Sequence, residues 1–590
     1  MSGSPEASRV VSAYRRVLPA YTRYRIAQHI TPEVRSQVKK RIAEVAAVPQ
    51  QVDRIRVQRA VRRRPDLYSG PDRIPVTVDH QPRAAFVHED LTPLLARREN
   101  LDAVLDALEG AGIDHFCVRG AFDRSSTVAV ADRDRPRVLR ALARLCERTP
   151  GCVTPIPHGE SREPRFCEPG HQPGVWKRAA AAGAVRLTWF HTDPEGRLVL
   201  GVPYGCDVEF WTEETPGVLT APRRNRVTEV VPASGAPVEA SDSLFTRLAP
   251  AGRDPLPPVR TRAEFTAARP DDVDFPVDVV YTWVDGSDPE WLRRRAQAAG
   301  QAYHAEAANA ARYLSRDELK YSLRSLRMHA PWVRNIYLVT DDQVPAWLDT
   351  SVPGLKVVSH KEIFSDPSVL PTFNSHAIES QLHHIDGLAE HFLYFNDDMF
   401  LGREVVPQDF FHANGLTKFF PSPANVPQGE PSELDVPVSV AGKNNRELIE
   451  ERFGTTLTQK MKHVPYPLRR SVLHEIEEEF AERHRTTMGN RFRSLDDLSI
   501  ASSLHHYYAF HTGRAVPGNL RYSYVDLALP DTPDRLARLL ARRNRHAFCL
   551  NDTVSTERDV EAQLALLGPF LEAYFPLPSR FEKSDRRETR

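Results

Sequence analysis

Residues 275–400 alternate short apolar runs with helical patterns, and this alternation constrains the fold more than any other feature of the chain. Four runs are rich in β-branched and aromatic residues and end in polar side chains: PVDVVYTWVDG, RNIYLVTDD, GLKVVSHKE and HFLYFNDDM. Strands that alternate with helices predict βαβ units around a buried parallel sheet. Ligands of such sheets bind beyond the carboxyl ends of the strands, so the sequence predicts a site where the four polar clusters meet.

The chain has 590 residues, which is too long for a single hydrophobic core. Residues 70–248 show a second series of strands and helices and are expected to form a smaller accessory α/β domain. The proline-rich segment 249–272 is expected to be a linker, followed by the main domain, 273–580, and a charged tail, 581–590. We therefore predict a mixed, mainly parallel, Rossmann-like α/β fold behind an accessory α/β domain and a basic helical arm, residues 1–69.

The charge of the chain is balanced overall but unevenly distributed. Basic and acidic residues number 78 each, and a dedicated nucleic-acid binder usually carries a basic excess, so we expect no nucleic-acid partner. Residues 9–64 are strongly basic, with apolar residues at near-helical spacing. This arm is either a solvated helical face or a peripheral contact to an anionic membrane surface.

Composition also bears on the compartment. No run approaches the about 18 apolar residues that span a bilayer, and the N-terminus lacks the apolar core of a signal peptide. We expect a cytoplasmic protein, with contact of the arm to the inner membrane face as the alternative. The six cysteines form no metal-binding pairs and are expected to be small buried thiols. Asp132 and Asp134 precede a predicted helix, so they are either helix caps or catalytic carboxylates.

The strongest chemical signal is the pair Asp397 and Asp398, which follows the apolar run 392–395. Two adjacent carboxylates at the end of a buried strand are costly unless they are paired, solvated or bound to a cation. Oxygen ligands of this kind suit Mg²⁺ or Mn²⁺ carrying a diphosphate. We expect this pair to hold the metal ion, and a solvated loop is the alternative.

The first apolar run ends in a turn that precedes a predicted helix. Asp285 and Gly286 form a tight turn, Ser287 follows, and Trp283 stands at the mouth of the strand. A helix N-terminus beside a sheet edge can bind a phosphate. An ordinary strand–turn–helix junction is the alternative interpretation.

A helix is predicted in the segment PTFNSHAIESQLHHI. Asn374 and Ser375 stand at its start, and Glu379 lies one turn inside, which fits either a capped helix or a functional carboxylate. His383 and His384 have no acidic partner at a convincing interval. They are expected to be packing or surface residues.

Three later groups are further candidates. His463 lies in a proline-bounded loop, and Arg493 precedes a helix that is expected to begin at Ser494. Arginine at such a position can hold a phosphate through two hydrogen bonds. Asn551 follows the last short apolar run, HAFCL. A purely structural role is the alternative for each group.

At these residues the chain resembles the stealth protein family. That family includes bacterial capsular and exopolysaccharide hexose-1-phosphate transferases and the GlcNAc-1-phosphotransferase catalytic chain that tags lysosomal enzymes. Four blocks within residues 275–552 carry the resemblance, in the family's order: FPVDVVYTWVDGSDPEW; RDELKYSLRSLRMHAPWVRNIYLVTDDQVPAWL through PTFNSHAIES to YFNDDMFLG; FRSLDDLSIASSLHHYYAF; and FCLND. The first 270 residues lie outside the resemblance.

The resemblance implies a sugar-1-phosphate transferase that uses a UDP-sugar donor and a polysaccharide acceptor. A hexose-1-phosphate or N-acetylhexosamine-1-phosphate would pass to a hydroxyl of a growing exopolysaccharide, leaving a phosphodiester and UMP. The matching positions imply catalytic roles for Glu379, Asp398, His463 and Arg493. Asp285 stands where many members have asparagine. The residues expected to contact substrate are Trp283, Asp285, Gly286, Ser287, Asn374, Ser375 and Asn551.

Two other functions remain open on the residues alone. A metal-dependent glycosyltransferase would use the same donor but would be attacked at the anomeric carbon. A non-catalytic polysaccharide-binding protein would use the same cavity without turnover.

Overall fold

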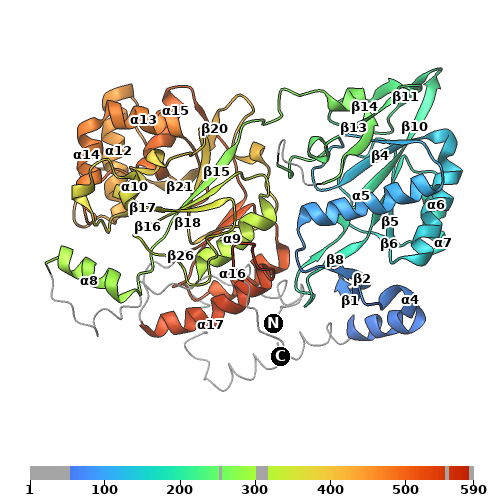
Figure 1. Cartoon of the computed structure of the whole chain (residues 1–590), viewed down its shortest axis with the longest axis horizontal. Coiled ribbons are helices and arrows are strands. Elements are labelled where there is room, and N and C mark those ends of the chain that lie inside the picture. Colours follow the sequence, from blue (N-terminus) through green and yellow to red (C-terminus); the bar gives the residue numbers. More distant parts are fainter. Residues whose placement is uncertain (1–52, 251–255, 301–316, 552–556, 584–590) are drawn as a thin grey trace, which may run out of the picture. The chain divides into compact units, whose positions relative to one another are not determined.

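The structure is a computed structural model that describes residues 53–250, 256–300, 317–551 and 557–583. Most of the expected basic arm therefore lies outside the described residues. The chain divides into two compact units (Figure 1). The accessory unit comprises Met1–Leu91, Leu95–Gly235 and Pro533–Arg542, and the main unit comprises Thr92–Leu94, Ala236–Thr532 and Arg543–Arg590.

The accessory unit contains a mixed sheet in which β3, β4, β10, β7, β5 and β6 follow one another. Strands β4 and β10 are parallel, and the other neighbours in this run are antiparallel. A second sheet has the order β1-β2-β8-β9. The elements are α4 (Pro65–Tyr68), β1 (Arg73–Val78), β2 (Gln81–Val87), α5 (Pro93–Gly110), β3 (His115–Cys117), β4 (Ser126–Ala131), α6 (Arg135–Arg148), β5 (Cys152–Ile156), β6 (Glu168–Pro169), α7 (Pro173–Ala179), β7 (Ala184–Thr188), β8 (Phe190–Thr192), β9 (Val199–Leu200), β10 (Cys206–Thr215), β11 (Val218–Thr220) and β12 (Val230–Pro232).

Asp132 and Asp134 belong to a short 3₁₀ turn, Asp132–Asp134, ahead of α6. Asp132 pairs with Arg135 at 2.6 Å, and Asp134 pairs with Arg137 at 2.9 Å. Neither side chain caps α6 through a hydrogen bond, so the carboxylates serve the helix as ion-pair partners one turn away. All six cysteines are free and buried, which confirms the expectation of buried thiols.

The main unit is built on the predicted sheet, whose order is β17-β16-β15-β18-β23. The first four strands are parallel, and β23 is antiparallel to β18. The four apolar runs of the sequence form β15 (Val277–Thr282), β16 (Ile336–Thr340), β17 (Leu355–Ser359) and β18 (His391–Asn396). The expected mixed, mainly parallel α/β fold is therefore confirmed.

The main unit contains further elements. Its helices are α8 (Pro289–Ala298), α9 (Glu318–His329), α10 (His360–Ile363), α11 (Ser375–Glu379), α12 (Pro437–Phe453), α13 (Arg470–Glu479), α14 (Ala481–Gly489), α15 (His505–His511) and α17 (Glu557–Tyr574). Helix α16 (Thr532–Arg542) belongs to the accessory unit except for its first residue. The other strands of the main unit are β13 (Pro237–Ala240), β14 (Val259–Arg262), β19 (Met399–Leu401), β20 (Thr417–Phe419), β21 (Pro421–Asn425), β22 (Gln459–Met461), β23 (Tyr466–Arg469), β24 (Ala515–Pro517), β25 (Tyr522–Asp526) and β26 (Ala547–Asn551).

Strand β14 lies inside the segment 249–272 that was expected to be a linker. The domain limits drawn from the sequence stay a prediction.

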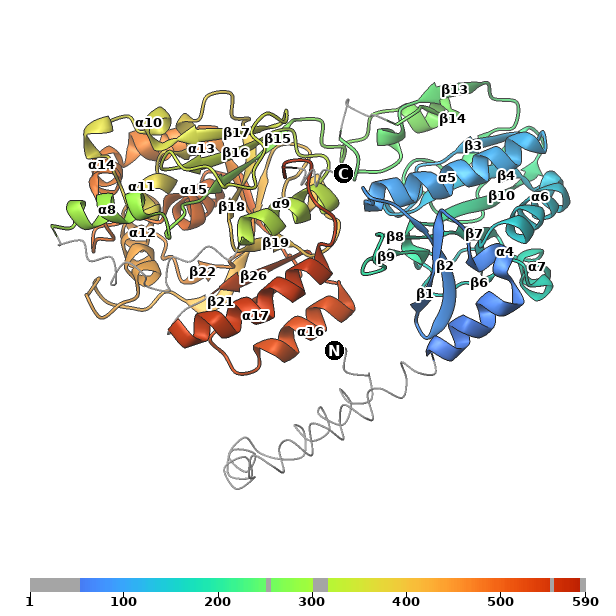
Figure 2. The same ribbon diagram turned by 60° about the horizontal axis from the view of Figure 1, so that its bottom comes forward.

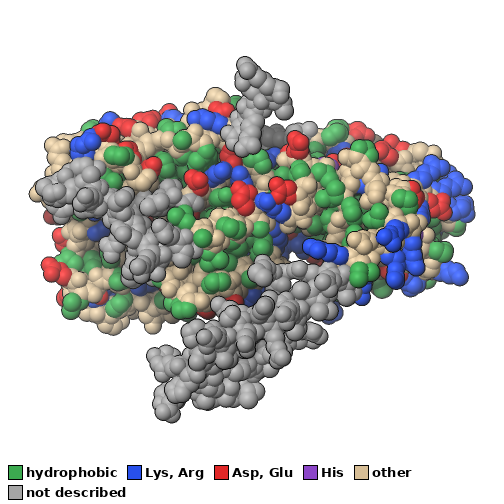
Figure 3. Space-filling model, turned by 90° about the horizontal axis from the view of Figure 1, so that it is seen from below, with side chains coloured by type: hydrophobic (Ala, Val, Ile, Leu, Met, Phe, Trp, Pro, Cys, Tyr) green, Lys and Arg blue, Asp and Glu red, His purple; other side chains and the backbone are tan. Residues whose placement is uncertain are grey.

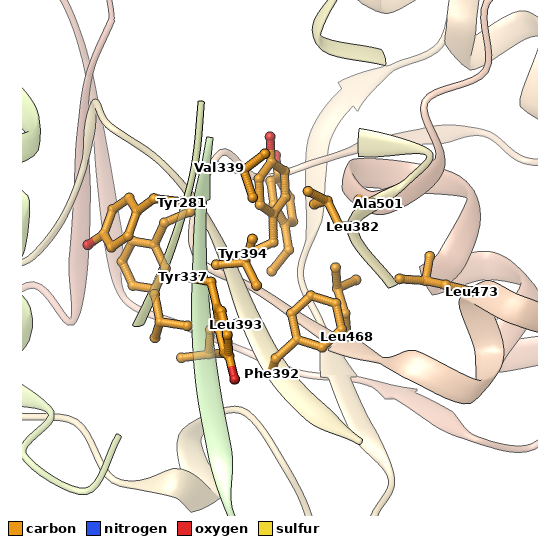
Figure 4. Close-up of a cluster of buried hydrophobic side chains, with 14 of the residues drawn as sticks. Tyr281, Tyr337, Val339, Leu382, Phe392, Leu393, Tyr394, Leu468, Leu473 and Ala501 are labelled. Carbon is orange, nitrogen blue, oxygen red and sulfur yellow. The ribbon is translucent and has the colours of Figure 1, made fainter. Parts of the chain in front are cut away.

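The core of the main unit packs on both sides of this sheet (Figure 4). Phe392 and Leu393 are fully buried on β18, and each side chain of this size contributes about 1.5–3 kcal/mol when it leaves water. Helix α9 adds Leu319, Leu323 and Leu326, whose spacing places them on one helical face. This packing fixes the strands whose carboxyl ends carry the polar clusters.

Helix α17, the long helix of the C-terminal region in Figures 1 and 2, contacts α9 through side chains. The Tyr321 hydroxyl donates a hydrogen bond to Glu572 at 2.8 Å, and Arg324 donates to the Phe575 carbonyl at 2.9 Å. Arg324 also forms a two-point ion pair with Glu582. Among the described helices, none combines the length and apolar character that a membrane crossing requires.

Candidate active site

Asp398 lies in the turn between β18 and β19, where three segments of the chain meet. Strand β19 pairs antiparallel with β26, which places Met399 opposite Cys549. The Cys549 thiol donates to Asp398 Oδ2 at 3.1 Å, and the Leu550 backbone N–H donates to the Asp398 carbonyl at 3.1 Å. The final sequence block therefore forms one wall around this carboxylate.

His463 approaches Asp398 from the opposite strand. Because β23 pairs antiparallel with β18, the loop before β23 lies at the carboxyl end of β18. His463 Nε2 lies 3.2 Å from Asp398 Oδ1, and His463 Nδ1 lies 3.3 Å from the Tyr466 hydroxyl. Burial disfavours the imidazolium, but the Asp398 carboxylate outweighs burial and raises the pKa of His463. Burial likewise disfavours the carboxylate, but His463 outweighs it and lowers the pKa of Asp398.

At Asp397, backbone hydrogen bonds offset the effect of burial on the pKa only in part. Burial, followed by the negative charges of Glu318 and Asp398, raises the pKa of Asp397 to about 8. The neighbouring Asn396 Oδ1 is buried without a hydrogen-bond partner. Crowded carboxylates and an unsatisfied amide oxygen are the surroundings that a hard divalent cation relieves. Asp398, His463 and Cys549 also lie close enough together to share one metal ion.

Glu379 is a buried carboxylate at the end of α11. Its Oε1 accepts a hydrogen bond from the Tyr394 hydroxyl at 3.3 Å, and its Oε2 accepts one from Ser502 at 2.9 Å. The Tyr394 hydroxyl also contacts Thr282 at 3.0 Å, which ties the group to the end of β15. Two hydroxyl groups thus fix the orientation of this carboxylate.

Arg493 and α11 are joined at the start of the helix. Arg493 donates a hydrogen bond to the Ser375 hydroxyl. Asn374 is fully buried, caps α11 by accepting from the His376 N–H at 3.1 Å and donates to Asp497 at 2.9 Å. These bonds hold the loop that carries Arg493 against the helix that carries Glu379.

The helix expected to begin at Ser494 begins later. The residues from Ile500 to Leu504 form a π-helical turn that leads into α15. The Asp497 carboxylate accepts from the Ser494 N–H and from Asn374, so this segment folds as a loop. Side-chain hydrogen bonds to the backbone here compete with helix formation.

A cavity of about 390 Å³ brings these side chains together. Five of the candidate residues from the sequence line it: Ser375, Glu379, His463, Arg493 and Asn551. Asn396, Lys460, Tyr466, Ser502 and Tyr524 also line it. The lining thus combines one carboxylate with cationic and hydroxyl groups, next to the Asp397–Asp398 turn.

The turn after β15 does not contribute to this lining. Trp283 is buried, and Asp285 Oδ1 accepts from the N–H and the hydroxyl of Ser287 at 2.9 and 2.6 Å. Gln343 holds the backbone of Asp285 at 2.9 and 3.0 Å. Within the described residues, these bonds build the strand–turn–helix junction around Gly286. A donor contact at this turn stays a prediction.

Several residues of the site were not candidates from the sequence. Lys460, Tyr394, Tyr466 and Ser502 reach it through strand pairing and the π-helical turn, which no local pattern predicts. Cys549 belongs to the FCLND block, so the sequence did offer a sign that it lies near the site.

His383 and His384 do have an acidic partner, although none stands at a convincing sequence interval. Their Nε2 atoms lie 2.6 and 2.9 Å from Glu477 Oε2, although Glu477 follows them by more than 90 residues. His383 is fully buried, and burial lowers its pKa to about 4. The sequence gave no sign of this partner, because Glu477 on α13 comes close to the two histidines only when the chain folds.

The fold and the site together define an α/β protein whose acidic residues cluster at the carboxyl edge of a mainly parallel sheet. The chain belongs to the stealth family. Models of stealth conserved regions 1, 2, 3 and 4 match residues 275–303, 312–419, 462–510 and 537–590. The expected resemblance, and with it the expectation of an enzyme, is confirmed.

Relatives match both units of the chain. Exopolysaccharide phosphotransferase SCO2594 of Streptomyces coelicolor is 54% identical over 98% of this chain and 99% of its own length. SCO6023 of the same organism is 50% identical over 99% of each chain. CpsY of Mycobacterium tuberculosis is 36% identical over 86% of this chain and 92% of its own length. The galactosyltransferase LgtC matches 51% of this chain and 97% of its own at 11% identity, with a TM-score of 0.27, which is too low to carry an argument.

Proposed function

We propose that the protein transfers a hexose-1-phosphate or N-acetylhexosamine-1-phosphate from a UDP-sugar to a hydroxyl of a growing exopolysaccharide. The products are a phosphodiester and UMP. The names of the relatives support the reaction class. The observation that carries the proposal is the cavity that joins Glu379, His463 and Arg493 beside the Asp397–Asp398 turn.

The oxygen-rich turn fits a Mg²⁺ or Mn²⁺ ion. Asp397 and Asp398 would hold it, and the unpartnered Asn396 Oδ1 offers a further ligand. When bound, such an ion would neutralise negative charge on the donor diphosphate. In the Asp398 group, His463 and Cys549 serve the carboxylate as hydrogen-bond partners.

Glu379 is the general base of the proposed reaction. It takes the proton of the acceptor hydroxyl while that oxygen attacks the sugar-proximal phosphorus, and the bond to the UMP oxygen breaks. Its carboxylate is fixed by Tyr394 and Ser502 and faces the cavity. His463 is not assigned as the base, because Asp398 raises its pKa and the imidazole stays protonated over more of the neutral range. The protonated ring would stabilise the negative charge of the reacting phosphoryl group.

Arg493 and Lys460 are the cations that would hold the non-bridging phosphoryl oxygens. Both line the cavity, and the hydrogen bond from Arg493 to Ser375 orients the guanidinium at its edge. The Lys460 ammonium lies 2.9 Å from the Ser439 hydroxyl. Cations fixed before the donor arrives stabilise the transition state without reorganisation.

The accessory unit is proposed to grip the acceptor polymer. A cavity of about 530 Å³ in this unit is lined by basic side chains, among them Arg56, Arg59, Arg63 and Arg83. Figure 3 shows Lys and Arg side chains gathered on the accessory unit. A polymer that already carries phosphodiesters is anionic and would suit this cavity. Replacing Arg59 and Arg63 by alanine should then raise the KM for the polymer and leave the KM for the UDP-sugar unchanged.

Location is part of the same proposal. The protein would act in the cytoplasm or at the inner membrane face, with the basic arm as a peripheral tether. The arm can be tested by comparing vesicle binding of the full chain on anionic and neutral lipids.

Incubation with a panel of UDP-sugars, Mg²⁺ and polymer tests the reaction. The proposal predicts UMP and a phosphodiester signal in the ³¹P NMR spectrum of the product. Release of UDP with a phosphorus-free product would instead establish a glycosyltransferase. A non-catalytic role would leave the cellular phenotype intact after Asp398→Ala, whereas the proposed enzyme loses it.

A further inference from the structure

Four histidines and one glutamate gather behind α11, outside the cavity lining. We name them the histidine cluster: His383, His384, His474, Glu477 and His484. The first two belong to the turn Leu382–His384, His474 and Glu477 lie one turn apart on α13, and His484 lies on α14. Two regions distant in sequence, the turn and the consecutive helices α13 and α14, thus bring imidazoles to one carboxylate.

The geometry of this cluster is close to that of a metal site. His383, His474 and Glu477 each offer a ligand atom, and these three atoms lie within 4.8 Å of one another. The rings of His383 and His474 are 4.5 Å apart and nearly perpendicular. Zinc holds nitrogen and carboxylate ligands at about 2.0–2.2 Å, which puts neighbouring ligand atoms about 3.3 Å apart in a tetrahedron. Shifts of the three ligand atoms by about 1 Å or less would complete such a site.

Hydrogen bonding to Glu477 alone does not account for the cluster. Glu477 Oε2 is hydrogen-bonded to the Nε2 atoms of His383 and His384, at 2.6 and 2.9 Å. The Nδ1 atom of the fully buried His383 has no hydrogen-bond partner. An unsatisfied polar atom at this depth calls for a ligand or a compensating contact.

We propose that the histidine cluster binds a divalent transition-metal ion of the zinc class through His383, His474 and Glu477. His384, beside the same carboxylate oxygen, is the nearest further ligand. Imidazole nitrogens favour zinc-like ions, whereas the oxygen-rich turn at Asp397 and Asp398 favours magnesium-like ions. The two sites therefore differ in the metal that they favour, although the Asp398 group can also take zinc.

The position of the cluster gives this metal a structural role. His484 Nε2 donates to the Ser380 carbonyl at 3.0 Å, next to Glu379, and Arg470 at the start of α13 donates to the His383 carbonyl at 2.8 Å. Leu382 and Leu473, which precede two of the ligands, belong to the same buried cluster (Figure 4). A metal here ties α13 to the segment that follows Glu379, so it positions that carboxylate without touching substrate.

Zinc content of the full chain tests the proposal. The protein is stripped with a chelator, equilibrated with Zn²⁺ in excess Mg²⁺, dialysed and measured by mass spectrometry of the metal. Asp398, His463 and Cys549 can also take zinc, so the readout is the difference between the wild type and His474→Ala. His412→Ala, an exposed histidine elsewhere in the main unit, is the matched control.

We expect His474→Ala to hold one equivalent of zinc fewer than the wild type and the control. Co²⁺ substitution should give a ligand-field spectrum that this variant lacks. If His474→Ala does not fold by circular dichroism, Glu477→Gln serves, because glutamine keeps an acceptor but loses the anionic ligand. Equal zinc content in the wild type and the folded variant overturns the proposal. The readout is metal content, so failure of the proposed transferase reaction would not affect it.

Discussion

Asp397 makes the stability of the metal-free main unit depend on pH, in the direction opposite to an ordinary aspartate. Burial and the neighbouring Glu318 and Asp398 carboxylates raise its pKa from 3.8 to about 8. Between these values the folded protein binds a proton that the unfolded chain does not. The unfolding free energy must therefore fall as the pH rises through this window, and Asp397→Asn should remove the effect.

The magnitude follows from the two pKa values. Each pH unit within the window costs about 1.4 kcal/mol, and the slope flattens as the folded carboxyl begins to ionise near pH 8. From pH 6 to pH 8 the loss from Asp397 is about 2 kcal/mol. Saturating magnesium removes this dependence, because the cation displaces the proton from the folded carboxyl and the unfolded chain binds no proton there in this pH range either.

Urea unfolding at pH 6, 7 and 8 measures this effect. The chain is held in EDTA, and the fluorescence transition of the wild type is compared with that of Asp397→Asn, so that the contributions of all other titrating groups cancel. The wild type should lose about 2 kcal/mol more than the variant across this range. Parallel pH profiles of the two proteins would refute the reasoning. In a repeat with saturating Mg²⁺ the extra loss of the wild type between pH 6 and pH 8 should disappear.

Three further results are expected. Glu379→Gln should lower kcat for UMP formation by about 10²–10⁴-fold with little change in the KM for the UDP-sugar, and an unchanged kcat would exclude it as the base. Arg493→Lys should lower kcat/KM for the UDP-sugar by about tenfold, because an ammonium cannot form the planar two-point contact; an unchanged kcat/KM would contradict this. Phe392→Ala should lower the unfolding free energy by about 3–5 kcal/mol in urea titrations, against less than 0.5 kcal/mol for the exposed control Leu434→Ala.

The sheet was predictable from the sequence because its signal is local. Each of β15, β16 and β18 is a short apolar run with polar residues after it, and burial on both faces demands that pattern, whereas the edge strand β17 keeps Lys356 exposed. The same pattern predicted that Asp397 and Asp398 lie at the end of a strand.

The partners of these residues were not predictable in the same way. His463 meets Asp398 through the register of β23 on β18, and Cys549 meets it through β26 on β19. Strand register across such distances depends on tertiary packing and leaves no local pattern. For the same reason, the sequence did not reveal Glu477 as the partner of His383.

The contact of Cys549 with Asp398 has a consequence for the synthesis of the protein. The two residues are 151 positions apart in the sequence. At about 5–20 residues per second, a ribosome needs roughly 8–30 s after Asp398 to deliver the strand that completes its surroundings. During that interval the nascent carboxylates lie at an open edge in water and cannot form the finished pocket. Translation thus sets a delay before the surroundings of Asp398 can be completed, and a chain that stops short of β26 lacks one wall of this site.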